Sequence, residues 1–475
     1  MTEAAANHSP DESDAPGVLI VHLLRPTGAQ AQWVNRILAL GARYAHARLG
    51  RRGREGGTTA NPERIHWPRW PRADAETERA LRDVLYSGKW TLSGASRGEK
   101  PYEQRFAEAF ARFNGSAYCV PCSSGSAALT LALRALDVPP GSEVIVPGLT
   151  WVAVPASVVE VGATPVLVDL DADTLCISPE ETRRAVGPRT SAIIMVHAFC
   201  ALADIAGFLA LAKETGVPLV EDCSHMHGAV WKGRRVGSFG RIGLFSMQQS
   251  KVLTCGEGGA LLTDDPALYR RLQQLRADGR LYAARHVKGA MDIEKAGDVM
   301  GRNYNLSEFH AAILLDRLRH LDAENATREE NARILDGLLE EIPGVSPLSR
   351  TPGTDRQTYY EYCVRFDLER FGSRSIDELA EAMTHDLGCA VEPIYEPFTA
   401  NVLYRPQTVL PDRPELDPAR FQLPVAERAR RECLALPHHV LLAPREAMGR
   451  IAGAIRVLAR RGQDEEETRE EVRRR

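Results

Sequence analysis

Short apolar segments alternate with helical patterns through the middle of the chain, and this alternation predicts the fold class. Five segments rich in Val, Ile and Leu have the length of buried strands, at residues 118–120, 143–147, 165–169, 192–197 and 218–222. Helical patterns separate them, at residues 126–136, at 151–161, after Ser178-Pro179-Glu180-Glu181 and at 205–214. Buried strands alternating with helices form parallel sheets with crossover connections. We therefore expect an α/β protein with a mostly parallel sheet covered by helices on both faces.

The pattern changes after Gly301. Helices are expected at residues 307–321 and 322–339, then a strand at 359–366 and a helix at 375–387. This mixture predicts a smaller C-terminal α+β domain over residues 326–475, which ends in a charged tail that forms a frayed helix. A large domain is expected over residues 65–325, with its N-terminal helix also contributing to the small domain.

The first 64 residues differ in composition from the rest of the chain. Met1–Ala15 is small, polar and acidic, residues 31–49 have a helical pattern, and residues 51–57 are basic and rich in glycine. Such a linker is flexible in solution. A basic arm of this kind can touch nucleic acid, but a solvated leader is the simpler interpretation. We predict a flexible N-terminal extension and assign it no function.

Composition and charge exclude several classes of protein. The chain has 475 residues, 59 Lys and Arg against 63 Asp and Glu, a net charge of −4 and 44% hydrophobic residues. That apolar fraction excludes wholesale disorder, and the near-neutral charge gives no support for nucleic acid or an anionic membrane as the main partner. The apolar run at residues 18–24 is far shorter than the roughly 20 residues of a membrane span, and acidic residues precede it. We expect a soluble cytoplasmic protein.

The nine cysteines are scattered from Cys119 to Cys433. Cys119 and Cys122 form a C-x-x-C, but a structural zinc site needs a second pair, and no other pair has that spacing. We expect ordinary buried thiols rather than a disulfide framework or a metal site.

In parallel sheets, ligands bind at the carboxyl ends of the strands, so residues at those positions are the candidates for chemistry. Ser123-Ser124-Gly125-Ser126 joins a strand to a helix, where small residues and the helix N-terminus favour a phosphate; a simple helix cap is the alternative. Asp222 ends a strand and either holds a proton on a heterocyclic nitrogen or caps the next segment. His225 and His227 form H-x-H, but a third metal ligand is missing.

Lys251 follows a further apolar strand that runs from Gly243 to Ser246. A lysine among apolar residues has a lowered pKa, which suits an amine that forms a Schiff base. The alternative is a surface lysine whose stem packs between strands. The sequence contains neither a G-x-x-x-x-G-K-[ST] motif nor a strand-linked G-x-G-x-x-G motif, which weakens nucleotide-binding interpretations.

Together these features meet the requirements of pyridoxal 5'-phosphate. The serine-rich turn and Ser246 hold a phosphate, Lys251 forms the Schiff base, and Asp222 keeps a pyridine nitrogen protonated so that the ring accepts electrons.

Three motifs strengthen this interpretation: Glu221-Asp-Cys-Ser-His-Met-His-Gly-Ala229, Phe245-Ser-Met-Gln-Gln-Ser-Lys-Val-Leu-Thr-Cys-Gly-Glu-Gly-Gly259 and Tyr304-Asn-Leu-Ser-Glu308. With them, residues 66–460 resemble the DegT/DnrJ/EryC1/StrS aminotransferase family. Four further segments are most similar to its aminocyclitol branch: Trp67-Pro-Arg-Trp-Pro71, Pro147-Gly-Leu-Thr-Trp151, Gln248-Gln249 and Arg356-Gln-Thr-Tyr-Tyr360. The resemblance implies fold type I of the pyridoxal-phosphate transferases, with a seven-stranded sheet. It also implies transfer of an amino group from L-glutamine or glutamate to a cyclic ketone such as scyllo-inosose or 2-deoxy-scyllo-inosose.

The resemblance also implies a role for each site residue. Lys251 is the Schiff-base lysine and general acid/base, Asp222 pairs with the pyridine nitrogen, and His225 lies near the phenolic oxygen. Trp151 stacks on the ring, although an aromatic at a helix start is often an ordinary core residue. Three residues hold the phosphate: Gly125, Ser126 and Ser246. Asn303, or alternatively Asn305, reaches the phosphate of the partner subunit, so a homodimer with shared active sites is expected.

Other functions on the same fold stay open at this point. The acceptor can be a nucleotide-linked keto-sugar, or the reaction can be that of the 3-amino-5-hydroxybenzoate synthases, which also have a His where His225 stands. A non-catalytic regulatory protein is a more distant alternative, and the presence of Lys251 and Asp222 argues against it. Some relatives have His in place of the lysine and are dehydratases, so Lys251 favours transamination.

Overall fold

The computed structural model describes residues 66–474, and side chains up to residue 462. Its centre is a seven-stranded sheet in the order β1-β9-β8-β5-β4-β2-β3, and only β9 runs antiparallel to its neighbours. The strands are β1 Tyr118–Cys122, β2 Glu143–Pro147, β3 Thr164–Val168, β4 Thr190–Val196, β5 Leu219–Asp222, β8 Ile242–Ser246 and β9 Gly259–Thr263. The mostly parallel sheet expected from the sequence is confirmed.

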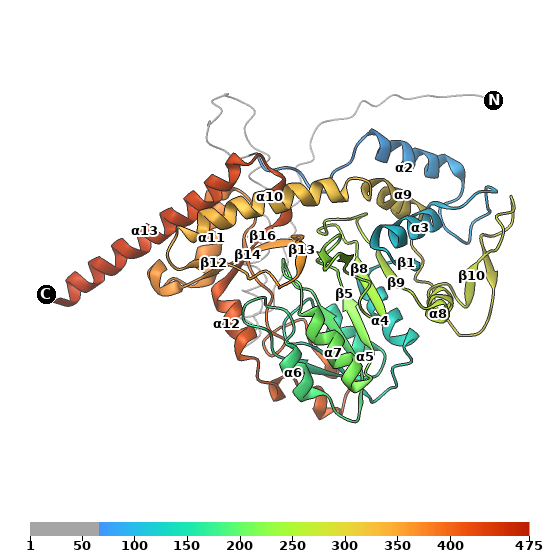
Figure 1. Cartoon of the computed structure of the whole chain (residues 1–475), viewed down its shortest axis with the longest axis horizontal. Coiled ribbons are helices and arrows are strands. Elements are labelled where there is room, and N and C mark those ends of the chain that lie inside the picture. The colour runs from blue at the N-terminus through green and yellow to red at the C-terminus, as the bar shows by residue number, and fades with distance from the viewer. Residues whose placement is uncertain (1–65, 475) are drawn as a thin grey trace, which may run out of the picture. The chain divides into compact units, whose positions relative to one another are not determined.

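Helices cover both faces of this sheet because successive strand residues point to opposite sides. In β2, Ile145 packs into one core cluster with Phe110 and Phe208, and Val146 packs into the other with Leu131. The first face carries α3 Tyr102–Asn114 and α7 Ile205–Thr215, and the second carries α4 Gly125–Ala135, α5 Ala153–Glu160 and α8 Pro266–Arg276. Figure 1 shows these helices flanking the strands.

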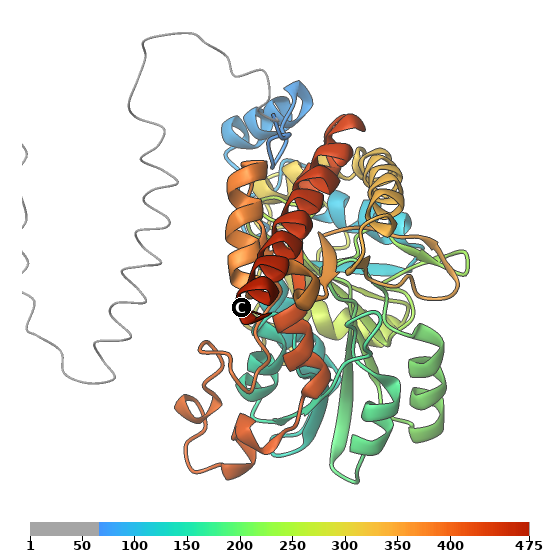
Figure 2. The same ribbon diagram turned by 90° about the vertical axis from the view of Figure 1, so that its left-hand side faces the viewer.

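A second, four-stranded antiparallel sheet has the order β12-β14-β16-β15. Its strands are β12 Val345–Pro347, β14 Glu361–Phe366, β15 Glu392–Pro393 and β16 Cys433–Pro437. The helices α10 Leu321–Glu340, α11 Ile376–Leu387 and α13 Glu446–Arg474 lie side by side next to this sheet (Figures 1 and 2). This is the smaller C-terminal domain; both sheets belong to one compact unit, Arg64–Arg475, and the boundary at residue 325 stays a prediction.

The remaining elements are shorter or connect the two sheets. The helices are α2 Ala75–Ser87, α6 Pro179–Ala185, α9 Glu308–Arg317 and α12 Pro424–Glu432, and the strands are β6 Val230–Trp231, β7 Arg234–Arg235, β10 Arg280–Tyr282, β11 Ile293–Lys295 and β13 Thr354–Arg356. Five 3₁₀ helices are η1 Leu368–Phe371, η2 Pro406–Thr408, η3 Pro414–Leu416, η4 Pro418–Arg420 and η5 His438–Leu442. As expected, Ser178 caps α6 by accepting a hydrogen bond from the Glu181 backbone N–H at 3.2 Å.

Several boundaries differ from the sequence-based expectations. The expected helix at 307–321 ends at Arg317, and the expected strand at 359–366 begins only at Glu361. Tyr360 does not join that strand's ladder, because its backbone N–H donates to the carbonyl of Phe199 at 3.2 Å, in the loop after β4. The expected helix at residue 151 begins at Ala153. The helix expected at residues 31–49 lies outside the described residues.

The nine cysteines are free thiols, and eight of them are buried, in agreement with the expectation. Over the described part of the chain, the structure has no helix both long enough and apolar enough to cross a membrane.

Candidate active site

Neighbouring strands bring the predicted residues together at one edge of the large sheet. Asp222 is the last residue of β5 and Ser246 is the last residue of β8, and these parallel strands are adjacent. The Ser224 side-chain oxygen accepts a hydrogen bond from the Ser246 backbone N–H at 3.1 Å, so the two strand ends are tied to each other. The start of α4 follows β1, and Trp151 follows β2.

The turn before α4 has the properties of an anion site. The Ser124 hydroxyl caps the helix by accepting from the Ala127 N–H at 3.0 Å, and Gly125 and Ser126 are the first two helical residues. The first N–H groups of a helix lack partners within it and favour negative charge. A Cβ at Gly125 would lie 2.6 Å from the Cβ of Ser246. Glycine therefore allows the helix start and the end of β8 to approach and form one small polar surface.

Asp222 is buried, with 4% of its surface exposed. One oxygen accepts a hydrogen bond from the Ser224 N–H at 2.9 Å. Burial raises the pKa of Asp222, and the nearby hydrogen bonds and the Lys251 charge oppose that shift. A carboxylate in such a place is stabilised by a cationic N–H partner.

His225 is a neutral imidazole with a defined tautomer. Its Nδ1 accepts a hydrogen bond from the Phe199 backbone N–H at 2.9 Å, so the ring proton is on Nε2. Burial lowers the pKa of His225 well below its usual value, and the positive charge of Lys251 adds to the effect. The ring stacks on Tyr360 with centroids 4.2 Å apart. His225 can therefore donate a hydrogen bond from Nε2 to a ligand oxygen.

Lys251 is buried, with 8% of its surface exposed, in the loop between β8 and β9. Its Nζ lies 3.6 Å from the centroid of the Tyr360 ring. Burial lowers the pKa of Lys251 to about 8, while the carboxylates of Glu361 and Asp222 act in the opposite direction. The neutral amine that a nucleophilic lysine requires is thus far more abundant near neutral pH than in an ordinary lysine. The alternative of a surface lysine is wrong.

Trp151 and Asn303 lie away from this cluster. Trp151 is 52% exposed, and its ring centroid is 5.9 Å from that of Tyr395. Tyr395 in turn lies 6.2 Å from His225, so Trp151 is at the open side of an aromatic group around the site. Asn303 is exposed, and its side-chain oxygen accepts hydrogen bonds from the backbone and the amide group of Asn305, at 3.2 and 2.9 Å.

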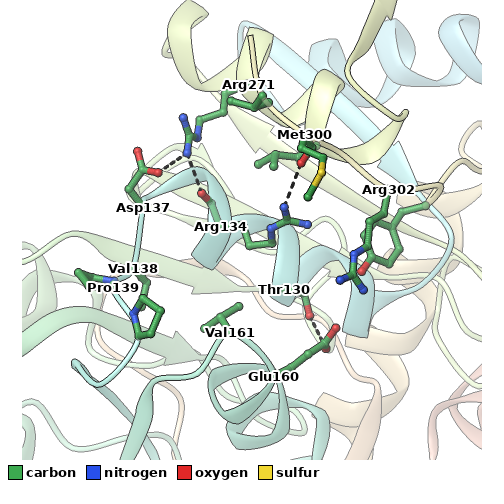
Figure 3. Close-up of a pocket in the computed structure, with 14 residues that line it drawn as sticks. Thr130, Arg134, Asp137, Val138, Pro139, Glu160, Val161, Arg271, Met300 and Arg302 are labelled. Carbon is green, nitrogen blue, oxygen red and sulfur yellow. Dashed lines mark hydrogen bonds and ion pairs between the residues drawn. The ribbon is translucent and has the colours of Figure 1, made fainter. Parts of the chain in front are cut away.

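The loop that carries Asn303 borders a cavity of about 700 Å³ between α4 and α8 (Figure 3). Arg134 donates a hydrogen bond to the Met300 carbonyl at 3.1 Å, and Arg302 lines the same cavity. The loop continues to Tyr304, whose carbonyl accepts from the Ser123 N–H at 2.8 Å. The Asn303 side chain itself lies on the protein surface.

The donor set fits pyridoxal 5'-phosphate. A helix start with serine hydroxyls suits the phosphate, and Asp222 suits a protonated ring nitrogen. The Nε2–H of His225 suits a phenolic oxygen, and Lys251 supplies an amine of lowered pKa. Each group thus offers the complementary charge or hydrogen bond to one part of the cofactor.

Sequence reasoning missed several residues of this region. A cavity of about 280 Å³ adjoins the Lys251 loop, and its lining residues are Trp70, Gln248, Gln249, Ser250, Tyr360, Glu361, Pro437, His438 and His439. Trp70 and Tyr360 are in segments that carried the family resemblance, but no role was expected of them. Glu361 and His438 come from the small domain, at positions far along the chain. Only the fold brings them to the lysine.

Comparisons with known proteins agree with this geometry. The model of the DegT/DnrJ/EryC1/StrS aminotransferase family matches residues 71–456, and the chain belongs to that family. The protein is therefore an aminotransferase. It is 47% identical over 397 residues to the L-glutamine:scyllo-inosose aminotransferase of Streptomyces griseus, covering 82% of this chain and 93% of that protein.

Two further similarities are informative. The chain is 46% identical over 405 residues to the L-glutamine:2-deoxy-scyllo-inosose aminotransferase of Streptomyces lividus, covering 84% of this chain and 95% of the relative. The crystal structure of 3-amino-5-hydroxybenzoic acid synthase matches with a TM-score of 0.72 at 31% identity, over 83% of this chain and 99% of that chain. The sequence is thus nearer to the aminocyclitol enzymes than to that synthase.

Proposed function

We propose that this aminotransferase uses pyridoxal 5'-phosphate to move an amino group from L-glutamine to scyllo-inosose or 2-deoxy-scyllo-inosose, in the biosynthesis of an aminocyclitol antibiotic. The identity of 46–47% to aminotransferases named for these ketones, over more than nine-tenths of their length, carries the proposal. The buried Lys251, Asp222 and His225 supply the chemistry that the reaction needs.

The cofactor, when bound, supplies an aldehyde that condenses with amines and a ring that accepts electrons from the amine-bearing carbon. Lys251 Nζ is the base that takes the proton from the α-carbon of the donor, and the acid that delivers a proton when the ketone is converted to an amine. Its lowered pKa, about 8, lets Nζ gain and lose a proton at little cost near neutral pH.

Other side chains hold and orient the reacting groups. The buried Asp222 carboxylate keeps a proton on the ring nitrogen, and His225 Nε2–H donates to the phenolic oxygen. Gly125, Ser126 and Ser246 hold the phosphate, while Trp151 covers one ring face. Asn303 contributes from the partner subunit of a homodimer, with Asn305 as the alternative for that contact.

The cavity next to the Lys251 loop suits a polyhydroxylated ring. Carboxamide, hydroxyl, carboxylate and imidazole groups line it, beside the indole of Trp70. Polyols are recognised by such convergent polar groups around an apolar surface. We assign the acceptor to this cavity.

Assays with purified protein and L-glutamine test the proposal. At least one of the two inososes should be aminated, and a nucleotide-linked keto-sugar should not. Amination of the keto-sugar alone would reject the assigned acceptor.

Replacing Lys251 with alanine should abolish both the visible absorbance of the loaded protein and its turnover, because no other buried amine adjoins Asp222 among the described residues. Normal transamination by K251A would show that another group does this chemistry.

A further inference from the structure

The loop that carries Lys251 is held by side chains from distant parts of the chain. The Lys251 N–H donates to the Gln248 carbonyl at 2.9 Å and forms a tight turn. The next three carbonyls, those of Gln249, Ser250 and Lys251, accept hydrogen bonds from outside the loop. Such a loop has few ladder contacts to fix it, so these bonds decide where its backbone lies.

Two donors serve these three carbonyls. The Trp70 indole Nε1–H lies 3.1 Å from the Gln249 oxygen and 3.2 Å from the Lys251 oxygen. The His438 Nε2 lies 3.1 Å from the Ser250 oxygen. The rings of Trp70 and His438 meet edge to face, with centroids 4.6 Å apart.

Arg328 determines the direction of the His438 bond. The Arg328 Nε–H donates to His438 Nδ1 at 3.2 Å. An arginine only donates, so Nδ1 is the acceptor and the ring proton is on Nε2, facing the Ser250 carbonyl. Arg328 is fully buried, and its guanidinium carbon lies 5.3 Å from the Trp70 ring centroid.

Arg328 is itself held in place. Its Nη1 donates to the Asn325 side chain at 3.0 Å, and its Nη2 pairs with Glu324 one turn earlier on α10, at 3.5 Å. The His438 ring therefore faces the loop from a fixed position, at the start of η5.

We propose that Trp70 and His438 are positioning residues for Lys251: they fix the backbone of residues 249–251 so that Nζ is presented at the site. The inference rests on the proposed role of Lys251 as the reacting amine, but not on the identity of the ketone. A displacement of about 1 Å at a reacting group costs on the order of 100-fold in rate, whereas one such hydrogen bond makes only a small contribution to the stability of the whole fold. Loss of either donor should thus affect the lysine more than the fold.

The chain offers a matched control for Trp70. The Trp67 indole N–H donates to the Leu387 carbonyl at 2.7 Å and does not bond to the lysine loop. W70F and W67F each remove one indole N–H donor and keep an aromatic ring, in the same segment; the Trp70 donor serves two carbonyls and the Trp67 donor serves one. H438L removes the donor to Ser250, and H438Q restores an N–H near the position of Nε2.

The measurements are the rate at which the apoprotein forms the visible-absorbing species with pyridoxal phosphate, kcat, KM and the melting temperature. W70F and H438L should lower that rate and kcat about tenfold or more with the KM for L-glutamine changed less than about threefold, and H438Q should recover much of the loss. W67F should lower the melting temperature about as much as W70F does. Its rate of reaction with pyridoxal phosphate and its kcat should stay within about twofold of the wild-type values.

Equal behaviour of W70F and W67F, or no recovery in H438Q relative to H438L, would overturn the proposal. If the wild-type protein aminates neither inosose, the assigned acceptor fails. The rate of reaction with pyridoxal phosphate still decides the role of Trp70 and His438 in that case.

Discussion

Tyr360 contacts the two reactive side chains of the site at once. One face of its ring meets the Lys251 ammonium at 3.6 Å, and the ring also stacks on His225 at 4.2 Å. The ring favours the charged form of the lysine through its quadrupole, while burial favours the neutral form. Burial also outweighs the carboxylates of Glu361 and Asp222, since the pKa of Lys251 falls to about 8.

The next residue, Glu361, gives a prediction about pH. Its pKa is raised to about 7 by burial, and its carboxylate raises the pKa of Lys251. E361Q removes that negative charge, so the ammonium loses stabilisation and the pKa of Lys251 should fall below about 8. The pH dependence of the reaction of the apoprotein with pyridoxal phosphate measures this value, because only the neutral amine reacts.

The midpoint of that pH profile should therefore move to lower pH in E361Q. E340Q is the control, because Glu340 is an exposed residue of α10. A midpoint that stays in place or rises in E361Q would show that Glu361 does not act on the lysine.

At the scale of elements, local signals located every strand of the large sheet except β9, and packing set the ends of the elements. Ser178-Pro179 begins α6 as the capping pattern predicts. β9, which no pattern indicated, pairs with both β1 and β8. β9 is short and follows a glycine-rich segment, so whether this segment forms a strand depends on its hydrogen-bonded neighbours, β1 and β8.

The capping box of α11 allows a test at this scale. The Ser375 hydroxyl accepts from the Glu378 N–H at 3.3 Å, and the Glu378 carboxylate accepts from the Ser375 N–H at 2.7 Å. S375A should destabilise the protein by about 1 kcal/mol and leave kcat unchanged, because α11 does not line the site. Thermal unfolding and steady-state assays measure both quantities.

S346A is the matched control for this variant. Ser346 is an exposed serine of β12 in the same domain. Equal melting temperatures for S375A and S346A would mean that the capping box contributes nothing measurable.

At the scale of the whole molecule, the site needs parts that lie far apart in sequence. Lys251 follows a strand of the large sheet, Tyr360 and Glu361 come from the start of β14, and Trp70 precedes α2. Asn303 is exposed within its own subunit, which agrees with the proposed role in the partner's site.

The proposal that two subunits share their active sites predicts complementation between inactive variants. K251A and N303D should each be inactive or nearly so as separate proteins. After co-refolding, the mixed dimer combines an intact Lys251 from one subunit with an intact Asn303 from the other. About one quarter of the wild-type activity should return, since about half of the dimers are mixed and each has one complete site of two. Activity that stays at the level of the separate variants would contradict sites shared through Asn303.

The sequence was sufficient to predict the class of fold, the family and the candidate residues for the chemistry. Period-two and period-3.6 patterns are local, and such patterns locate the strand that Asp222 ends and the strand that precedes Lys251. The tertiary structure alone decided what surrounds those residues. The pKa of Lys251, the tautomer of His225 and the hydrogen bonds from Trp70 and His438 to the lysine loop depend on burial and on contacts between different segments. The sequence separations of these hydrogen bonds range from 26 residues at His225 to 188 residues at His438. The pattern of apolar and polar residues within a short stretch of sequence carries no information about such contacts.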